Sequence, residues 1–456
     1  MSCASARSSR GGRLMIPFLG AFIALIVLAW GLDVTTLERS SATLPWLAYE
    51  QGLYLSGLLA IGLMSLAMVL ATRPVILERP LGGMDRVFRM HKWAAILATV
   101  FAALHWLIEM SDDLIKDLFG RAGRPGHMEF SGLYESLRDA GEELGEFAIY
   151  LLLGLVLLSL WKRFPYKAWR HLHRAMPALY LALAFHSAAL APPAWWTQAV
   201  GLLLMILLTA GSVAAIMALT GRIGRQRRVH GVVTSVSSPA PDITEVVCRL
   251  DGAWRGHRAG QFAFVSFVDS DPFEGAHPFT IASADHGDRS VTFQIKALGD
   301  YTRRLAGRVA AGQAVTVEGP YGRFVLDRRD RKAHQIWVAG GIGVTPFLAW
   351  LDELRATPSA APQADLHYST RAAASDPFVL RLQRLCADLP SVRLHVHDSS
   401  AGTGLTADAL DVGHLHGPRA EVWFCGPRRF GDQLAKSLQR AWTGNPRFRR
   451  EAFDMR

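Results

Sequence analysis

Cysteine is scarce in this sequence. The 456 residues include four cysteines, and none of them lies in a Cys-x-x-Cys motif. An iron–sulfur cluster needs four suitably spaced thiolates, so the sequence does not predict one. Such scattered cysteines also give no indication of a disulfide framework.

Charged residues are also few, at 19% of the chain, whereas 50% of the residues are hydrophobic. Long apolar runs dominate up to about residue 222, and short apolar runs mixed with charges follow. This change predicts a membrane part followed by a part outside the membrane. The net charge of +10 does not indicate nucleic-acid binding, because no basic stretch accompanies a docking motif.

Six apolar runs reach the length of about 20 residues that a helix needs to cross a bilayer. They lie near residues 14–32, 46–71, 88–110, 145–162, 174–192 and 197–220. The first run follows several arginines, as in a signal peptide, but it lacks a small-residue cleavage site, so we expect it to be retained. We expect a short N-terminal segment (1–13), a transmembrane domain (14–222) and two further domains (223–328 and 329–456).

Lysine and arginine predict the orientation, because they concentrate in cytoplasmic loops. They gather before the first run, between runs two and three, between runs four and five, and after run six. The acidic loop between runs three and four, with possible helix at 132–137, would then face outward. We therefore expect an integral protein of a bacterial-type plasma membrane with its last two domains in the cytoplasm.

Two pairs of histidines lie in these runs, where ionisable residues are usually functional. His91 and His105 are 14 residues apart, which is about 21 Å along a helix and within about 40° of one face. His173 and His186 are 13 residues apart with Pro177 between them, and proline can rewind a helical turn. Two matching pairs indicate two stacked haems, each held by two imidazoles. His171 is an alternative to His173, and proton-relay or packing roles are the alternative to haem.

The part of the sequence after the apolar runs contains two successive patterns. Short strands beginning near His230, Glu245, Phe262 and Ser290 predict a small antiparallel barrel. After residue 333, strands alternate with helices, which predicts a parallel sheet. Those strands begin near Gln335, Ala364, Val392 and Val422.

Two motifs in the expected barrel suit a flavin nucleotide. His277-Pro278-Phe279-Thr280 places an aromatic ring between polar groups, which suits stacking on a flat ring system. Lys296 precedes Gly299, where a turn opens a helix, and a helix N-terminus suits a pyrophosphate. Tyr301 and Thr302 lie in the first turn of that helix.

Three glycine turns suggest a dinucleotide site. Gly340-Gly341-Ile342-Gly343, followed by Thr345, is a strand–turn–helix sequence, although its spacing differs from the Gly-x-Gly-x-x-Gly fingerprint. Gly319-Pro320-Tyr321-Gly322 is a tight turn between domains, and Cys425-Gly426-Pro427 ends the last strand. Cys425 is either an inert buried thiol or a neighbour of the nicotinamide. Arg371 follows the second strand, where it suits a 2′-phosphate and favours NADPH over NADH.

In this order, the motifs resemble the ferric reductase and NADPH oxidase superfamily, and the last two domains resemble ferredoxin–NADP reductases. The resemblance implies a six-helix haem-binding bundle, an FAD-binding antiparallel β-barrel and an NADPH-binding α/β domain. It implies two b-type haems, one on His91 and His173 and the other on His105 and His186. It also implies catalytic roles for Thr280 beside the flavin, for Cys425 in the NADPH motif and for Phe453, which would cover the flavin that Phe279 packs against.

The activity implied by the resemblance is electron transfer from NADPH through FAD and the haems to an acceptor on the outer side. Dioxygen (giving superoxide), a ferric chelate and a quinone all stay open as acceptors. No Asp-x-Asp-x-Asp-Gly loop is present, so we expect no obligatory regulatory subunit. The alternative is a haem-free anchor or transporter fused to a flavin reductase.

Overall fold

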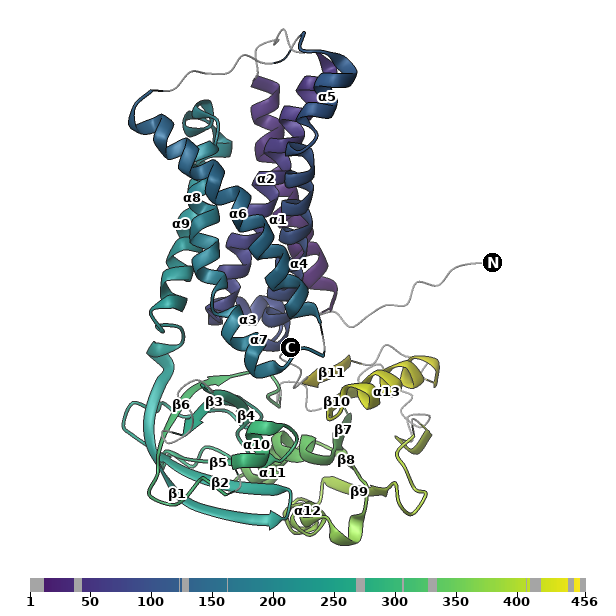
Figure 1. Ribbon diagram of the computed structural model, residues 1–456. Helices are drawn as coiled ribbons and strands as arrows, with labels where there is room; N and C mark the ends of the chain where they lie inside the picture. Colours follow the sequence, from purple (N-terminus) through teal and green to yellow (C-terminus); the bar gives the residue numbers. More distant parts are fainter. Residues whose placement is uncertain are drawn as a thin grey trace. The chain divides into compact units, whose positions relative to one another are not determined.

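The computed structural model describes most of the chain. The described residues are 12–36, 43–122, 124, 131–161, 163–267, 275–305, 307–326, 334–406, 408–410, 420–441 and 447–451. They form two compact units (Figure 1). We call residues 11–81 with 86–223 the helical unit, and residues 82–85 with 224–456 the sheet unit.

Five helices in the described part of the chain are long and apolar enough to cross a membrane. They are α1 (Gly12–Thr36), α2 (Leu44–Ala71), α4 (Met84–Glu109), α6 (Leu133–Leu160) and α9 (Ala199–Leu219). Four shorter helices accompany them: α3 (Val75–Leu81), α5 (Asp112–Phe119), α7 (Tyr166–His173) and α8 (Met176–Leu190). The expected helical content at 132–137 is the start of α6, which begins earlier than the predicted run at 145–162.

The expected fifth span, 174–192, is the short helix α8. Its 15 residues extend about 22 Å, less than the roughly 30 Å of a bilayer core. A turn at Arg174 and Ala175 separates it from α7. The sequence predicted six long spans, and five of the described helices have the required length.

Close packing in the helical unit depends on small residues. The Tyr180 hydroxyl of α8 lies 2.9 Å from Ser65 Oγ of α2. A Cβ at Gly211 of α9 would lie 2.0 Å from the same hydroxyl. Apolar side chains of α1, α2, α8 and α9, including Ile26 and Leu204, pack around this contact. Small residues of this kind let helices approach closely in membranes.

The sheet unit contains a six-stranded antiparallel sheet. Its strands are β1 (Arg228–Ala240), β2 (Ile243–Leu250), β3 (Phe262–Phe267), β4 (His277–Thr280), β5 (Ser290–Lys296) and β6 (Ala314–Tyr321). Their order is β4-β3-β6-β1-β2-β5, and one bridge between Ile281 and Phe293 connects the two edges. The short helix α10 (Asp300–Leu305) follows β5. We call residues 228–326 the antiparallel lobe.

A five-stranded parallel sheet forms the rest of this unit, which we call the parallel lobe (334–451). Its order is β11-β10-β7-β8-β9. The strands are β7 (His334–Gly340), β8 (Ala364–Thr370), β9 (Val392–Asp398), β10 (Ala420–Cys425) and β11 (Arg447–Glu451). Three helices accompany them: α11 (Thr345–Arg355), α12 (Pro377–Ala387) and α13 (Arg428–Ala441). The sequence reading missed β11.

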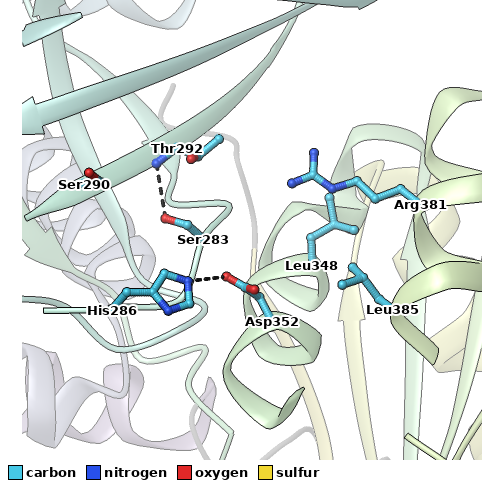
Figure 2. Close-up of a pocket in the computed structure, with 8 residues that line it drawn as sticks. All are labelled: Ser283, His286, Ser290, Thr292, Leu348, Asp352, Arg381 and Leu385. Atoms are coloured by element: carbon cyan, nitrogen blue, oxygen red, sulfur yellow. Dashed lines mark hydrogen bonds and ion pairs between the residues drawn. The ribbon is translucent and has the colours of Figure 1, made fainter. Parts of the chain in front are cut away.

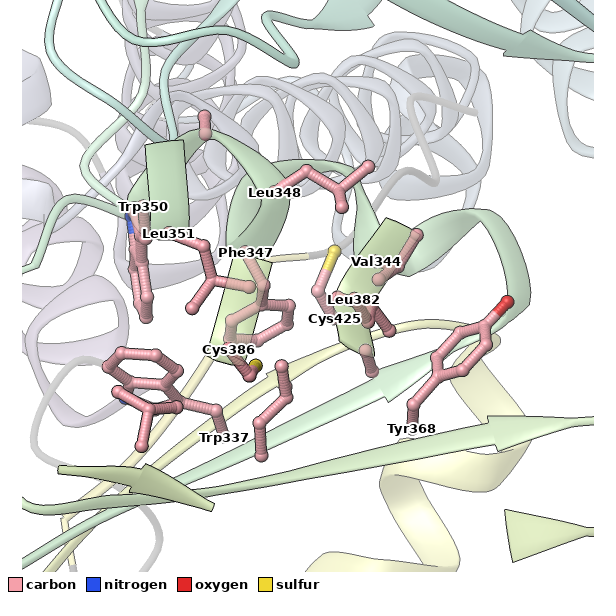
Figure 3. Close-up of a cluster of buried hydrophobic side chains, with 14 of the residues drawn as sticks. Trp337, Val344, Phe347, Leu348, Trp350, Leu351, Tyr368, Leu382, Cys386 and Cys425 are labelled. Atoms are coloured by element: carbon pink, nitrogen blue, oxygen red, sulfur yellow. The ribbon is translucent and has the colours of Figure 1, made fainter. Parts of the chain in front are cut away.

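Buried side chains of helix α11 form much of the hydrophobic core that packs on the parallel sheet (Figure 3), and residues of the antiparallel lobe contribute to the same core. Trp337, Phe347 and Trp350 are fully buried there. Phe324 of the antiparallel lobe stacks on Trp350 with ring centroids 5.0 Å apart. The Trp350 indole also donates to the Ala259 carbonyl at 3.1 Å. The two lobes are thus joined through α11.

Candidate functional site

The four histidines of the helical unit form two pairs. The ring centroids of His91 and His173 are 6.2 Å apart with an interplanar angle of 83°. Those of His105 and His186 are also 6.2 Å apart, at 87°. Two imidazoles that share one metal ion have centroids about 6 Å apart, because each metal–nitrogen bond is about 2 Å. Both pairs therefore have the spacing of a bis-imidazole metal site.

Backbone carbonyls orient three of these rings. The Nδ1 atoms of His91 and His186 donate to the carbonyls of Ala67 and Gly141, each at 2.8 Å. Nδ1 of His105 donates to the Leu53 carbonyl at 3.0 Å. A carbonyl oxygen only accepts, so each Nδ1 carries the proton and each Nε2 keeps its lone pair for a metal.

His173 is held differently. Its ring stacks on Trp169 with centroids 5.1 Å apart, and its Nδ1 has no hydrogen-bond partner among the described residues. His171, the alternative ligand, is exposed, whereas the His173 ring faces His91. The geometry favours His173 as the partner of His91.

Glycines create the space for the second pair. A Cβ at Gly145 of α6 would lie 2.3 Å from Nδ1 of His186, and a Cβ at Gly57 of α2 would lie 3.0 Å from Nδ1 of His105. The two histidine rings therefore occupy the space that a side chain at Gly145 or Gly57 would fill. The sequence reading missed both glycines, since only tertiary contacts distinguish them from other glycines in apolar runs.

The break between α7 and α8 explains the 13-residue spacing. In a continuous helix, thirteen steps would leave His173 and His186 about 140° apart around the axis. Pro177 has no N–H, and its ring would clash with the carbonyl of His173, four residues earlier. The helix therefore ends at His173 and restarts at Met176, which lets both rings face α4.

The expected flavin motif lies on β4, an edge strand of the antiparallel sheet. The His277 ring stacks on Tyr301 with centroids 3.7 Å apart. Phe279 is half-buried against the lobe's core. Thr280 is 5% exposed, and its hydroxyl has no hydrogen-bond partner in the described part of the chain. A flavin edge, which carries nitrogen and oxygen atoms, is a suitable partner for that hydroxyl.

The turn before α10 differs from the expected pyrophosphate site. The Thr302 hydroxyl accepts from the backbone N–H groups of Leu298 and Gly299, each at 3.0 Å. The Lys296 ammonium lies 3.2 Å from a carboxylate oxygen of Asp242. These groups therefore have protein partners here, and α10 is only six residues long.

The tight turn expected at Gly319–Gly322 is not a turn: Gly319, Pro320 and Tyr321 end strand β6, and Gly322 follows it. A residue that the sequence reading missed fixes this strand end. Nη1 of Arg227 donates to the Pro320 carbonyl at 2.7 Å, and its guanidinium lies over the Tyr321 ring, 5.4 Å from the centroid. Gly322 has a φ of +101°, which favours glycine. A Cβ there would lie 3.4 Å from a carboxylate oxygen of Glu451, so the end of β6 lies against the end of β11.

The two other glycine turns meet at the carboxyl edge of the parallel sheet. Ala339 of β7 pairs with Cys425 of β10, so the turns after these strands are neighbours. A Cβ at Gly343 would lie 2.3 Å from the Cys425 carbonyl, and one at Gly340 would lie 2.9 Å from Pro427. Space around Gly341 is open, with a φ of +55°. This edge is where doubly wound sheets bind nucleotides.

The flanking residues of this edge come from β8 and α11. Arg371 is exposed and directly follows β8, the neighbour of β7. The Thr345 hydroxyl donates to the Ile342 carbonyl at 2.6 Å, which closes the first turn after the glycines. Gly426 leaves room for Gly340, whose Cα would lie 3.1 Å from a Cβ at 426.

Cys425 is fully buried among apolar side chains, including Val344 and Leu348 (Figure 3). Burial raises the pKa of its thiol well above the usual range, and the charge of Glu451 on the neighbouring strand adds to this. The thiol is therefore protonated near neutral pH, and a nicotinamide reaches it only if covering residues move. Phe453 lies outside the described residues.

Comparison with known proteins covers both units. Residues 56–184 match the family model "Ferric reductase like transmembrane component". Residues 236–325 match the model "FAD-binding domain". The first match contains His91, His105 and His173, and the second contains β4 and the Gly319–Gly322 segment.

Curated relatives include reductases and oxidases. The anthranilate 1,2-dioxygenase electron transfer component of Acinetobacter baylyi is 26% identical over 45% of this chain and 61% of its own. Dual oxidase 2 of Homo sapiens is 37% identical over 22% of this chain and 7% of its own. Ferric reduction oxidase 8 of Arabidopsis thaliana is 38% identical over 17% and 12%. This chain thus spans less than two thirds of each of these relatives. In its helical unit the chain is thus similar to ferric reductase-like transmembrane components, and in its sheet unit to FAD-binding domains.

Proposed function

We propose that this protein is a transmembrane oxidoreductase that transfers electrons from cytoplasmic NADPH to an acceptor on the outer side of the membrane. One NADPH supplies two electrons, so two molecules of a one-electron acceptor are reduced, and NADP⁺ and a proton are released. The observation that carries the proposal is the geometry of the two histidine pairs, in the same chain as an FAD-binding domain.

The histidine pairs suit two b-type haems. His91 with His173 would hold one haem, and His105 with His186 the other. A haem with two imidazole ligands carries single electrons and has no open position at the iron. The residues supply ligand orientation: the carbonyls of Ala67, Leu53 and Gly141 fix which nitrogen of each ring faces the metal.

The antiparallel lobe would bind FAD along β4. Bound FAD accepts two electrons as a hydride and releases them singly, which NADPH cannot do. Thr280 would offer its unpartnered hydroxyl to the flavin ring system, and Phe279 would pack against it. Arg227 would hold the Gly319–Gly322 segment at the end of β6 in place.

The carboxyl edge of the parallel sheet would bind NADPH. The backbone at Gly341 has open space around it, which permits close approach of a pyrophosphate. Arg371 would pair with the 2′-phosphate, so NADPH is preferred over NADH. Cys425 would shape the nicotinamide pocket rather than supply a nucleophile, because its thiol is buried and protonated.

The acceptor is proposed to be dioxygen, which would give superoxide, or a ferric chelate. Both accept single electrons and need no open coordination position on a haem. The relatives include both a dual oxidase and a ferric reduction oxidase. Their names support proposing both dioxygen and a ferric chelate as acceptors.

Cofactor stoichiometry of the full chain, purified in detergent from haem-replete cells, tests the proposal. We expect about two haems and one FAD per chain, and faster turnover with NADPH than with NADH. Superoxide formation and ferric chelate reduction, measured separately, rank the acceptors. FAD without haem would overturn the proposal in favour of a membrane-anchored flavin reductase.

A further inference from the structure

One carboxylate connects the two lobes of the sheet unit. Asp352 lies on α11 of the parallel lobe, and its Oδ2 accepts from the backbone N–H of Ala284 at 2.9 Å. The same oxygen accepts from Nε2 of His286 at 3.0 Å (Figure 2). Both donors belong to the antiparallel lobe. Among the described residues, Asp352 therefore joins the lobes through two contacts.

The connected segments both continue directly from the proposed cofactor sites. Ala284 follows Thr280, the end of β4, by four residues. Helix α11 begins at Thr345, immediately after the Gly340–Gly343 turn. A shift of α11 at Asp352 would therefore move the nucleotide turn relative to the flavin strand.

Side chains do not fill the interface around this contact. A cavity of about 200 Å³ lies between the lobes. Ser283, Ser290 and Thr292 line it from the antiparallel lobe, and Leu348 and Arg381 from the parallel lobe (Figure 2). The spacing of the lobes here thus depends on discrete polar contacts, namely Asp352 and the ion pair of Arg381 with Glu245, whose atoms are 2.7 Å apart.

A second, tightly packed contact holds α11 at Trp350. Its indole donates to the Ala259 carbonyl, and a Cβ at Gly260 would lie 2.6 Å from that indole nitrogen. Trp350 thus fixes one point of α11. The contacts at Asp352, two residues later, connect the same helix to the segment after β4.

We infer that Asp352 is a positioning residue for hydride transfer, which sets the nicotinamide of NADPH against the flavin by joining α11 to the 281–286 segment. The inference rests on the proposed function. In the reaction, a hydride leaves C4 of the nicotinamide with both bonding electrons and forms an N–H bond on the flavin. Such transfers depend steeply on the separation of the reacting atoms.

Three variants of the full chain separate positioning from simple destabilisation. Asp352→Ala removes both contacts. Asp352→Asn keeps an oxygen for the Ala284 N–H but loses the charge that attracts His286. The matched control is Asp388→Asn, which removes the ion pair of Asp388 with Arg355 (2.7 Å). That pair involves the same helix but lies within the parallel lobe.

Anaerobic stopped-flow reduction of the bound FAD by NADPH is the kinetic measurement. We expect the rate constant to fall about tenfold in Asp352→Ala, to fall less in Asp352→Asn, and to be unchanged in Asp388→Asn. The dissociation constant for adenosine 2′,5′-bisphosphate, which lacks the nicotinamide, should be the same in all four proteins. Amide hydrogen exchange in the 281–289 segment without nucleotide should speed up in Asp352→Ala alone.

The outcomes distinguish the two proposals. If NADPH and NADH both fail to reduce the wild-type flavin, the proposed function is wrong and the inference falls with it. If the wild type is reduced and Asp352→Ala is equally fast, only the inference is wrong. A parallel loss of bisphosphate binding would also overturn it, because Asp352 would then support the fold of the nucleotide site. Should Asp352→Ala fold poorly, the rates of FAD reduction in Asp352→Asn and Asp388→Asn are compared instead. Equal rates in these two variants would overturn the inference.

Discussion

Gly145 has no side chain, and the ring of His186 occupies the position where a Cβ would lie. That position is 2.3 Å from Nδ1 of His186, whereas a Cβ at Gly154 on the same helix would meet nothing within 4 Å. A haem ligand must keep its orientation as well as its chemistry. Single glycines therefore control ligand geometry here, although nothing in the sequence singles them out.

Gly145→Ala should displace His186 and weaken binding of the haem that we propose it shares with His105. We expect haem content to fall from about two per chain toward one, with FAD content unchanged. Pyridine haemochrome and flavin fluorescence assays measure the two cofactors. Gly154→Ala is the control and should keep both haems. Full haem content in Gly145→Ala would contradict the role given to this glycine.

His367 of β8 is a second residue whose environment makes a prediction. Its side chain is 3% exposed, and its ring stacks on His395 with centroids 4.6 Å apart. Burial, with the neighbouring His395 and His397, lowers the pKa of His367 to about 3. In the unfolded chain, a histidine pKa is about 6.5. Between these values the unfolded chain binds the extra proton, so stability is lost as the pH falls below about 6.5.

The expected loss from His367 between pH 7 and pH 5 is about 2 kcal/mol, or roughly 30-fold in an opening equilibrium. Hydrogen exchange of the 364–370 segment in the full chain, corrected for intrinsic rates, measures it. His367→Phe keeps an aromatic ring without the titration, so its protection should change much less with pH. An equal change in both proteins would show that other groups cause it.

At the scale of elements, the break between α7 and α8 shows what sequence could and could not predict. The sequence showed the apolar run at 174–192 and the two histidine spacings. Pro177 also indicated a disturbed helical turn. Two separate helices, with a turn at Arg174 and Ala175, were not readable, because a proline can either kink a helix or end it and the sequence pattern does not distinguish the two. Strand β11 was missed because its sequence, RFRRE, has little of the apolar alternation that marks a strand.

Pro177→Ala should allow α7 and α8 to join. Residue 177 would then donate to the His173 carbonyl, and His173 would rotate away from His91 by a large angle. We expect loss of the haem held by His91 and His173, while the haem on His105 and His186 is retained. Redox titration of the purified chain should show one haem component where the wild type shows two. Two unaltered components would mean that the proline does not determine the break.

At the scale of the whole molecule, composition and motif order predicted a membrane part followed by flavin and nucleotide domains. The two matched family models support a ferric reductase-like transmembrane part followed by an FAD-binding domain. The residues of the proposed flavin and nucleotide sites stay predictions, made from the glycine motifs and the His277–Thr280 motif because these have local signatures. Arg227, Glu451 and Asp352 were not readable, because each acts through contacts between distant segments.

In the proposed electron path, NADPH would reduce haems held by the two histidine pairs. An anaerobic visible spectrum of the full chain, recorded before and after NADPH, is the decisive measurement of this path. We predict sharp reduced b-type bands in the wild type, with about half that haem signal in His186→Leu. Flavin bleaching without any haem bands in protein from haem-replete cells would contradict the claim.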